Sequence, residues 1–253
     1  MALLTGKTAV ITGGTTGIGL ATAKQFVEQG AHVFITGRRQ AELDTAVKEL
    51  GDQATGIQGD VSKIEDLDRL YAAVADSGRR VDMVFANAAV IDVARIGEIT
   101  EEHLDYLLGV DLKGVVFTVQ KALPLLNDGA SVILNASNVA SRGADGIGVY
   151  AAIKAALRSF ARTWASELRD SKIRVNVVSP GATDTPGIET LAGMLNPGPG
   201  AVDEFRNYQS AVTPLGRLAD PDEVAKAALF LASDLSSFTT GAEIPVDGGI
   251  NQI

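Results

Sequence analysis

The sequence of 253 residues has no cysteine and only two histidines. Without cysteine the chain can form no disulfide bond and can offer no thiolate as a nucleophile or metal ligand, which fits a cytoplasmic protein. The histidines, His32 and His103, stand far apart in the sequence, and neither has the spacing of a metal-ligand pair. We therefore expect no metal site.

Long apolar runs are missing as well. The apolar stretches are short and broken by charged residues or glycine, so we expect no segment that spans a membrane. The first seven residues lack the basic region and the long apolar stretch of a signal peptide. The formal net charge of −9 argues against nucleic acid as a partner, because phosphate would be repelled.

Runs rich in β-branched residues alternate with longer helical patterns along the chain. Strands are expected at residues 8–12, 32–36, 54–58, 81–86, 131–135, 173–178 and 241–246. Helices are expected at residues 17–29 and 41–50, from a capping box at 62–65 onward, from about 100, through 111–126, at 149–168 and from 220 onward. Such alternation predicts an α/β fold whose parallel strands carry helices on both faces, in a single domain covering residues 1–253.

A glycine-rich loop lies between the first expected strand and the first expected helix. Its glycines permit a tight turn and a close approach to a pyrophosphate, and the start of the following helix offers free N–H groups to that anion. The loop therefore predicts a dinucleotide site. Its members are Gly13, Thr15, Thr16, Gly17, Ile18 and Gly19.

The spacing of this loop, Gly-x-x-x-Gly-x-Gly, resembles that of the short-chain dehydrogenase/reductase family. The resemblance covers nearly the whole chain, through Asn87-Ala88-Ala89, Ser137, Tyr150 with Lys154, Pro180-Gly181 and Asp247-Gly248-Gly249 in the family's order. It implies a doubly wound, Rossmann-like sheet and a nicotinamide cofactor. It also implies hydride transfer between a ketone and a secondary alcohol, with a homotetramer as the common assembly.

The resemblance implies further cofactor contacts. Asp60 and Val61 would border the adenine, and Asn87 with Ala88 would support the cofactor, although Asn87 alone reads equally well as a turn residue. The segment that contacts the nicotinamide carboxamide corresponds to Pro180 and Gly181, followed by Thr183 or Thr185.

Charge after the second expected strand indicates which nicotinamide cofactor is used. An NAD site usually has an acidic residue there, but residues 36–40 contain none and include Arg38 and Arg39. Guanidinium groups pair with a 2′-phosphate, whereas solvated arginines at a helix start would face an unfavourable dipole. The sequence therefore predicts NADP(H).

Tyr150 and Lys154 stand four residues apart in a helical pattern, so they share one helix face. A nearby ammonium favours the phenolate, which predicts a lowered pKa for Tyr150. The resemblance implies that Ser137 donates a hydrogen bond to the substrate carbonyl and that Tyr150 transfers the proton. It also implies that Lys154 holds the nicotinamide ribose, so that Tyr150 and Lys154 both contact the cofactor.

Asp111 departs from the family, which usually has asparagine at this place as part of a proton relay to the lysine. Two interpretations stay open. Asp111 is either a tolerated near-isostere or a buried charge that shifts the pH profile.

Residues 180–213 are rich in glycine and proline, and we expect a long, partly mobile insert there. Gly193 and residues 196–200 argue against a helix through its middle. Its place after the nicotinamide-contacting segment predicts a substrate lid at about residues 181–213, with packing against a neighbouring subunit as the alternative.

Two other functions compete with an NADP-dependent alcohol dehydrogenase or carbonyl reductase. A 3-ketoacyl-carrier-protein reductase would need basic residues to dock an acidic carrier, and residues 123–129 have none. A non-catalytic NADP redox sensor would have no need of the Ser137, Tyr150 and Lys154 set. Small-molecule ketones or alcohols are therefore the expected substrates.

Overall fold

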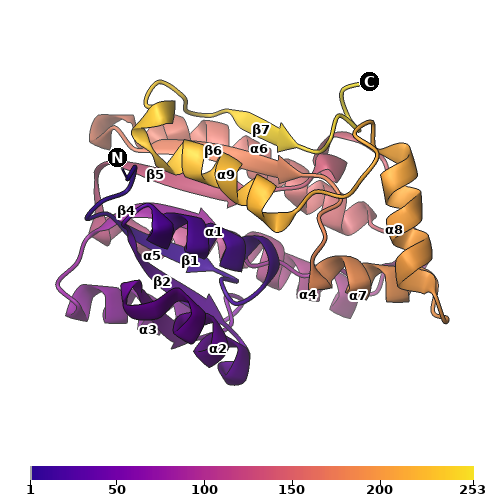
Figure 1. Ribbon diagram of the computed structural model, residues 1–253, viewed down its shortest axis with the longest axis horizontal. Coiled ribbons are helices and arrows are strands. Elements are labelled where there is room, and N and C mark those ends of the chain that lie inside the picture. Colours follow the sequence, from indigo (N-terminus) through magenta and orange to yellow (C-terminus); the bar gives the residue numbers. More distant parts are fainter. Residues whose placement is uncertain (1) are drawn as a thin grey trace.

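The computed structural model describes residues 2–253, whose strands form one parallel seven-stranded sheet (Figure 1). The strand order is β3-β2-β1-β4-β5-β6-β7, so the chain winds outward in both directions from the β1–β4 pair. This confirms the predicted doubly wound α/β fold. The strands are β1 (Thr8–Thr12), β2 (His32–Gly37), β3 (Ala54–Gln58), β4 (Val81–Ala86), β5 (Leu126–Asn135), β6 (Arg174–Pro180) and β7 (Glu243–Val246).

Helices follow most strands and cover both faces of the sheet (Figure 1). The α-helices are α1 (Gly17–Glu28), α2 (Gln40–Leu50), α3 (Ile64–Asp76), α4 (Glu101–Leu107), α5 (Val115–Ala122), α6 (Gly148–Glu167), α7 (Pro186–Leu195), α8 (Ala201–Val212) and α9 (Pro221–Ala232). Short 3₁₀ turns are η1 (Gly51–Gln53), η3 (Leu123–Leu125), η4 (Asn138–Ser141), η5 (Arg169–Ser171) and η6 (Asp234–Ser236). Among residues 2–253, no helix is long and apolar enough to cross a membrane.

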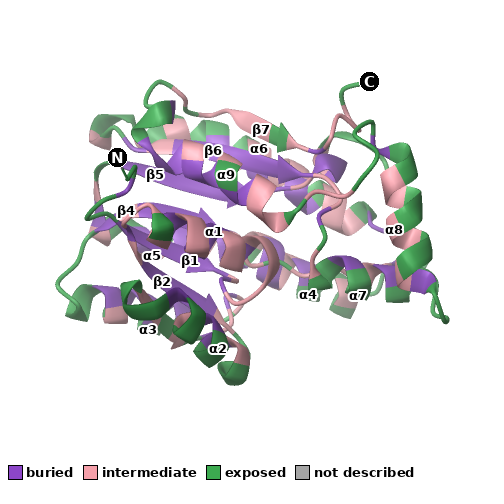
Figure 2. Ribbon diagram, viewed as in Figure 1, coloured by how far each residue is buried: buried purple, intermediate pink, exposed green. Residues whose placement is uncertain are grey.

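The strands are apolar on both faces because each face is covered. Val10 and Phe34 pack in one core with α3, α5 and α6, whereas the next residues along each strand, Ile11 and Ile35, pack in a second core with α1, α2 and α9. Side chains of a strand alternate between faces, so a doubly covered strand needs an unbroken apolar run. Figure 2 shows these strands buried between partly exposed helices.

The two helices expected in this part of the chain are present as α4 and α5, but they are joined without a break, so residues 101–125 form a continuous helical run. A π-helical segment, η2 (Leu108–Gly114), joins α4 to α5. Thr100 caps α4 as expected at its start, accepting a hydrogen bond from the His103 amide. The wider turns of η2 keep the chain helical through Gly109 and Gly114, and Asp111 lies within them, fully buried.

The capping box predicted at residues 62–65 is also wrong. The helix begins at Ile64 with Lys63 in the capping position. The Ser62 hydroxyl instead donates to Asp60 Oδ1 over 2.7 Å, while the Asp60 amide donates to Asp66 Oδ2 over 2.8 Å. The Ser62 hydroxyl therefore bonds to a neighbouring carboxylate and not to the backbone at the start of α3.

The segment at residues 180–213 is a pair of helices, α7 and α8, rather than a long loop. The interruption at residues 196–200 lies where expected, but Gly193 falls inside α7 without ending it. Pro186 at the first turn of α7 and the acidic Asp203 and Glu204 in the first turn of α8 favour these helix starts. Both helices extend beyond the end of the sheet in Figure 1.

The N-terminus of α9 is closed by a capping box, whose contribution to stability can be tested. Asp220 accepts from the Asp222 amide over 2.8 Å, and Glu223 accepts from the Asp220 amide over 2.8 Å. We predict that Asp220→Ala lowers the free energy of unfolding by about 1 kcal/mol, because the helix loses its cap. Urea denaturation measures the loss. Asp220→Asn, which keeps the acceptor, should stay near the parent, and an equal loss in both variants would contradict this role.

Candidate active site

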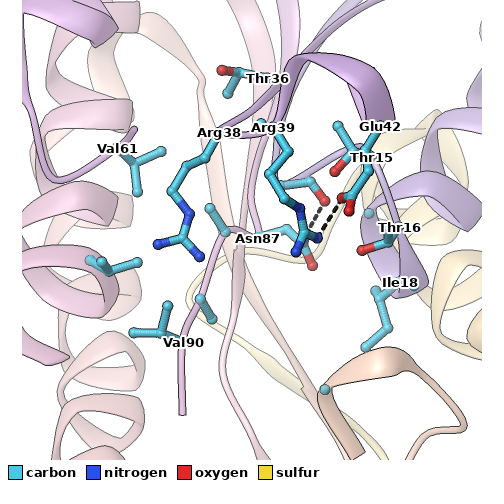
Figure 3. A pocket seen from close by; sticks show the side chains of 18 of the residues that line it. Thr15, Thr16, Ile18, Thr36, Arg38, Arg39, Glu42, Val61, Asn87 and Val90 are labelled. Carbon is cyan, nitrogen blue, oxygen red and sulfur yellow. Dashed lines mark hydrogen bonds and ion pairs between the residues drawn. The ribbon is translucent and has the colours of Figure 1, made fainter. Parts of the chain in front are cut away.

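A pocket lies at the carboxyl ends of β1, β2, β3 and β4, where the strand order reverses (Figure 3). Open parallel sheets hold their ligands at such a place. Most residues predicted to bind a cofactor line it: Gly13, Thr15, Thr16, Gly17, Ile18, Gly19, Arg38, Arg39, Asp60, Val61, Asn87, Ala88 and Thr185. The sequence analysis missed other lining residues: Thr36, Gly37, Glu42, Gly59, Ala89, Val90, Val110, Pro186 and Gly187.

Two glycines of the loop are required by close backbone approaches. Gly13 has φ of +64°, and a Cβ there would lie 2.9 Å from the Ala88 Cα. A Cβ on Gly19 would lie 2.0 Å from the Gly13 carbonyl oxygen. The first turn of α1 therefore packs directly on the loop. Thr16 precedes α1 and lines the pocket, and in the described residues its side chain makes no capping hydrogen bond to that helix. The first N–H groups of α1 therefore lack that acceptor.

Asn87 ties the loop to the centre of the sheet. Its Nδ2 donates to the Thr12 carbonyl over 3.0 Å and to the Gly13 carbonyl over 3.1 Å. Its Oδ1 accepts from Asn135 Nδ2 over 2.9 Å. The residue thus does more than form a turn, because it connects β1, β4 and β5 at their carboxyl ends. A dinucleotide phosphate lying on the loop would depend on this support.

The two arginines have different surroundings. Arg39 forms an ion pair with Glu42, which lies three residues further along and also lines the pocket. In Figure 3 the Arg38 guanidinium points into the pocket between Val61 and Asn87. No ion pair of Arg38 is present among residues 2–253. The argument that both arginines need an external anion therefore fails for Arg39, and the i,i+3 spacing to Glu42 was the signal that could have shown it.

The end of β6 distinguishes the two candidate threonines. Thr183 is buried and its hydroxyl donates to the Gly181 carbonyl over 3.0 Å. Gly181 packs against the Asp247 backbone, where a Cβ would lie 2.8 Å from the Asp247 Cα. Four residues at or after the end of β6 were expected to contact the cofactor. In the described part of the chain the pocket is lined by one of them, Thr185, and not by Pro180, Gly181 or Thr183.

A second group of predicted residues surrounds a buried ammonium. Lys154 on α6 is 1% exposed, and its Nζ donates to the Asn135 carbonyl over 3.1 Å. The same Nζ lies 3.3 Å from Asp111 Oδ2 and 5.2 Å from the centre of the Tyr150 ring. The fold therefore brings α6, η2 and the end of β5 together around one charge.

Asp111 has two partners. Its Oδ1 accepts a hydrogen bond from the Val90 amide over 2.8 Å, and its Oδ2 faces Lys154. Val90 lines the pocket, so the same carboxylate holds both the pocket wall and the lysine. Burial raises the pKa of Asp111, and the Lys154 ammonium acts in the opposite direction.

Lys154 acts to lower the pKa of Tyr150, as expected, but the net shift of that pKa is upward. Burial is the largest cause, and Lys154 and a hydrogen bond from Ser137 only oppose it, while Asp111 adds to it. For Lys154, burial alone would lower the pKa, but Asp111 and Tyr150 turn the shift upward. The cluster thus holds a charged lysine beside a protonated phenol at neutral pH.

Comparisons with known proteins agree with this architecture. A family profile described as "Enoyl-(Acyl carrier protein) reductase" matches residues 13–251. The oxidoreductase asL5 of Sarocladium schorii is 46% identical over 252 residues, covering 99% of this chain and 98% of the relative. An NADP-dependent (R)-specific alcohol dehydrogenase of Lentilactobacillus kefiri is 36% identical, covering 97% of both chains.

A solved structure is similar over the whole length of the chain. The short-chain dehydrogenase/reductase of Brucella melitensis, described as a glucose/ribitol dehydrogenase, superposes with a TM-score of 0.92 at 31% identity and covers 99% of both chains. With the glycine loop, the strand-end pocket and the sheet order in place, this chain is an oxidoreductase that belongs to the short-chain dehydrogenase/reductase family, whose members use nicotinamide cofactors.

Proposed function

We propose that this enzyme transfers hydride between NADP(H) and a ketone or secondary alcohol, as an NADP-dependent alcohol dehydrogenase or carbonyl reductase. The observation that carries the proposal is the buried Lys154 beside Tyr150 and Ser137, at the same sheet edge as the glycine-loop pocket. Bound NADPH would supply the hydride to the carbonyl carbon. Carbonyl reduction then needs one proton at the carbonyl oxygen, and in the proposal the Tyr150 phenol gives it.

The pocket fits a phosphorylated dinucleotide. The loop backbone leaves no room for side chains at Gly13 and Gly19, so a pyrophosphate could approach the N–H groups at the start of α1. Arg38 points into the pocket with a guanidinium that can pair with a 2′-phosphate. Lys154, with its remaining hydrogen-bonding capacity, would hold ribose hydroxyls. Thr185 is the better of the two threonines for the nicotinamide carboxamide, because it lines the pocket.

Within the proposal, Ser137 and Tyr150 share the substrate carbonyl. Ser137 caps η4 by accepting from the Val139 amide over 3.4 Å, and its hydroxyl donates to Asn138 Oδ1 over 3.3 Å. In the proposal a substrate carbonyl oxygen replaces Asn138 as the acceptor of that hydroxyl hydrogen. Tyr150 as a whole residue is partly exposed, and in the proposal its hydroxyl donates to the same substrate oxygen. Placing both donors at one oxygen stabilises the developing alkoxide in reduction. A homotetramer remains the expected assembly.

The first prediction from the proposed function distinguishes the roles of Arg38 and Arg39. Arg38→Ala should raise KM for NADPH on the order of tenfold and leave KM for NADH nearly unchanged, because only the 2′-phosphate loses its partner. Arg39→Ala is the matched control and should have a smaller effect, since Arg39 already pairs with Glu42. Steady-state kinetics with both cofactors measures these values. Equal affinity of the parent for NADPH and NADH would contradict the choice of cofactor.

The second prediction concerns the acid. Tyr150→Phe should lower kcat for ketone reduction by about 100-fold or more while NADPH binding stays within about twofold, because the phenol supplies a proton rather than affinity. Fluorescence titration gives the binding constant. Tyr106→Phe, on the exposed surface of α4, serves as control. If Tyr150→Phe retains most of the parent's turnover, another group is the acid.

The third prediction concerns the α7–α8 hairpin, proposed as the substrate lid. Met194, Leu195 and Tyr208 expose large apolar surfaces there, whereas Phe205 is half-buried. Alanine at any of the four should change the relative kcat/KM across a panel of ketones and leave NADPH affinity intact, because a lid contacts substrate. Ketones with a large apolar group should be better substrates than acetone. Leu235→Ala, exposed on η6, is the control; an unchanged preference in all lid variants would rule out this role.

A further inference from the structure

The charge balance around Tyr150 differs from that of a site with asparagine at position 111. Lys154 is 1% exposed and Asp111 0%, and their charged atoms lie 3.3 Å apart. The charged groups that act on the Tyr150 phenol are Lys154 from α6 and Asp111 from η2, and Ser137 from the end of β5 adds a hydrogen bond. Among residues 2–253 the hydrogen-bond partners of the pair are uncharged, namely the Asn135 carbonyl for Lys154 and the Val90 amide for Asp111.

Counting charges shows the consequence. With Asp111 ionised, Lys154 and Asp111 sum to zero, so loss of the Tyr150 proton would leave a net negative charge in a buried site. With asparagine at position 111, the same loss would take the cluster from one positive charge to zero. Creating a net charge in a buried cluster is costly, as in the case with Asp111, whereas neutralising one is favourable, as in the case with asparagine. The carboxylate should therefore hold the phenol in its protonated form.

We propose that Asp111 is a positioning residue whose carboxylate neutralises Lys154 and keeps Tyr150 protonated to higher pH than an amide would, which extends ketone reduction to higher pH and moves the onset of alcohol oxidation to higher pH. The effect on these two pH profiles rests on the proposed function. In reduction, the phenol O–H bond breaks and its proton goes to the carbonyl oxygen as the hydride of NADPH goes to the carbonyl carbon. The phenolate then regains a proton from water. Oxidation runs the other way and needs the phenolate, which Asp111 makes scarce.

The geometry allows the charge of Asp111 to be separated from its structural role. Oδ1 accepts from the Val90 amide, which positions the pocket wall, and Oδ2 faces Lys154. Asparagine keeps an acceptor for the Val90 amide and removes the charge, whereas alanine removes both. Asp111→Asn therefore tests the charge. The difference between Asp111→Asn and Asp111→Ala reports the loss of the hydrogen bond to Val90.

The decisive measurement needs neither cofactor nor turnover. Ultraviolet absorbance of tyrosinate, taken as the difference between a protein and its Tyr150→Phe derivative, isolates one of the four tyrosines during a pH titration. Asp111→Asn should lower the Tyr150 midpoint on the order of one pH unit. Asp82→Asn is the control, because Asp82 lies at the opposite end of the sheet, bound to the Thr8 amide, and should leave the midpoint unchanged. An unchanged midpoint in Asp111→Asn would overturn the proposal.

Kinetics extends the test to reaction direction. In Asp111→Asn, the rise of kcat/KM for alcohol oxidation with pH and the fall for ketone reduction should both move to lower pH. If the tyrosinate midpoint moves but no ketone in the panel is reduced by the parent, the proposed function fails and the role of Asp111 stands. If Asp111→Asn does not fold, infrared spectroscopy of the parent decides, since a protonated buried carboxyl band at neutral pH would overturn the proposal.

Discussion

A lysine ammonium buried in the interior is the feature on which the arrangement of the site depends. Lys154 has lost nearly all contact with water, and a lone buried cation would either lose its proton or destabilise the fold. The Asn135 carbonyl, the Asp111 carboxylate and the Tyr150 ring compensate for that loss. Three separate elements, β5, η2 and α6, must therefore meet at one point.

The same point connects to the glycine-loop pocket through Asn135 and through Asp111. Asn135 gives its carbonyl to Lys154 and its side-chain amide to Asn87, and Asn87 in turn holds the glycine loop. Asp111 holds Lys154 with one oxygen and the pocket-lining Val90 with the other. A chain of hydrogen bonds thus fixes the lysine and the loop relative to each other. Such pre-set geometry is what a hydride transfer between two bound molecules requires.

The sequence predicted the parts that local chemistry controls. The unbroken apolar runs gave the strands, because both faces of the sheet are covered, and the glycine spacing gave the loop, because the backbones of Gly13 and Ala88 leave no room for a side chain. The four-residue spacing placed Tyr150 and Lys154 on one face of α6. Errors arose where a neighbouring carboxylate bound a group that the sequence analysis had assigned to another partner. The Ser62 hydroxyl donates to Asp60 rather than capping a helix, and Arg39 forms an ion pair with Glu42.

By itself, the sequence determined the doubly wound fold, the place of the glycine loop and most of the residues that line its pocket, since each depends on periodicity or on spacing along the chain. Only the tertiary structure decided the surroundings of those residues. It turned Arg38 into the pocket and Thr183 away from it, made residues 186–212 helical on either side of a short break, and set Asp111 against Lys154. The burial of Tyr150 and its charged neighbour Asp111 come from elements distant in sequence. The upward shift of the Tyr150 pKa could therefore not be derived from the one-turn spacing to Lys154.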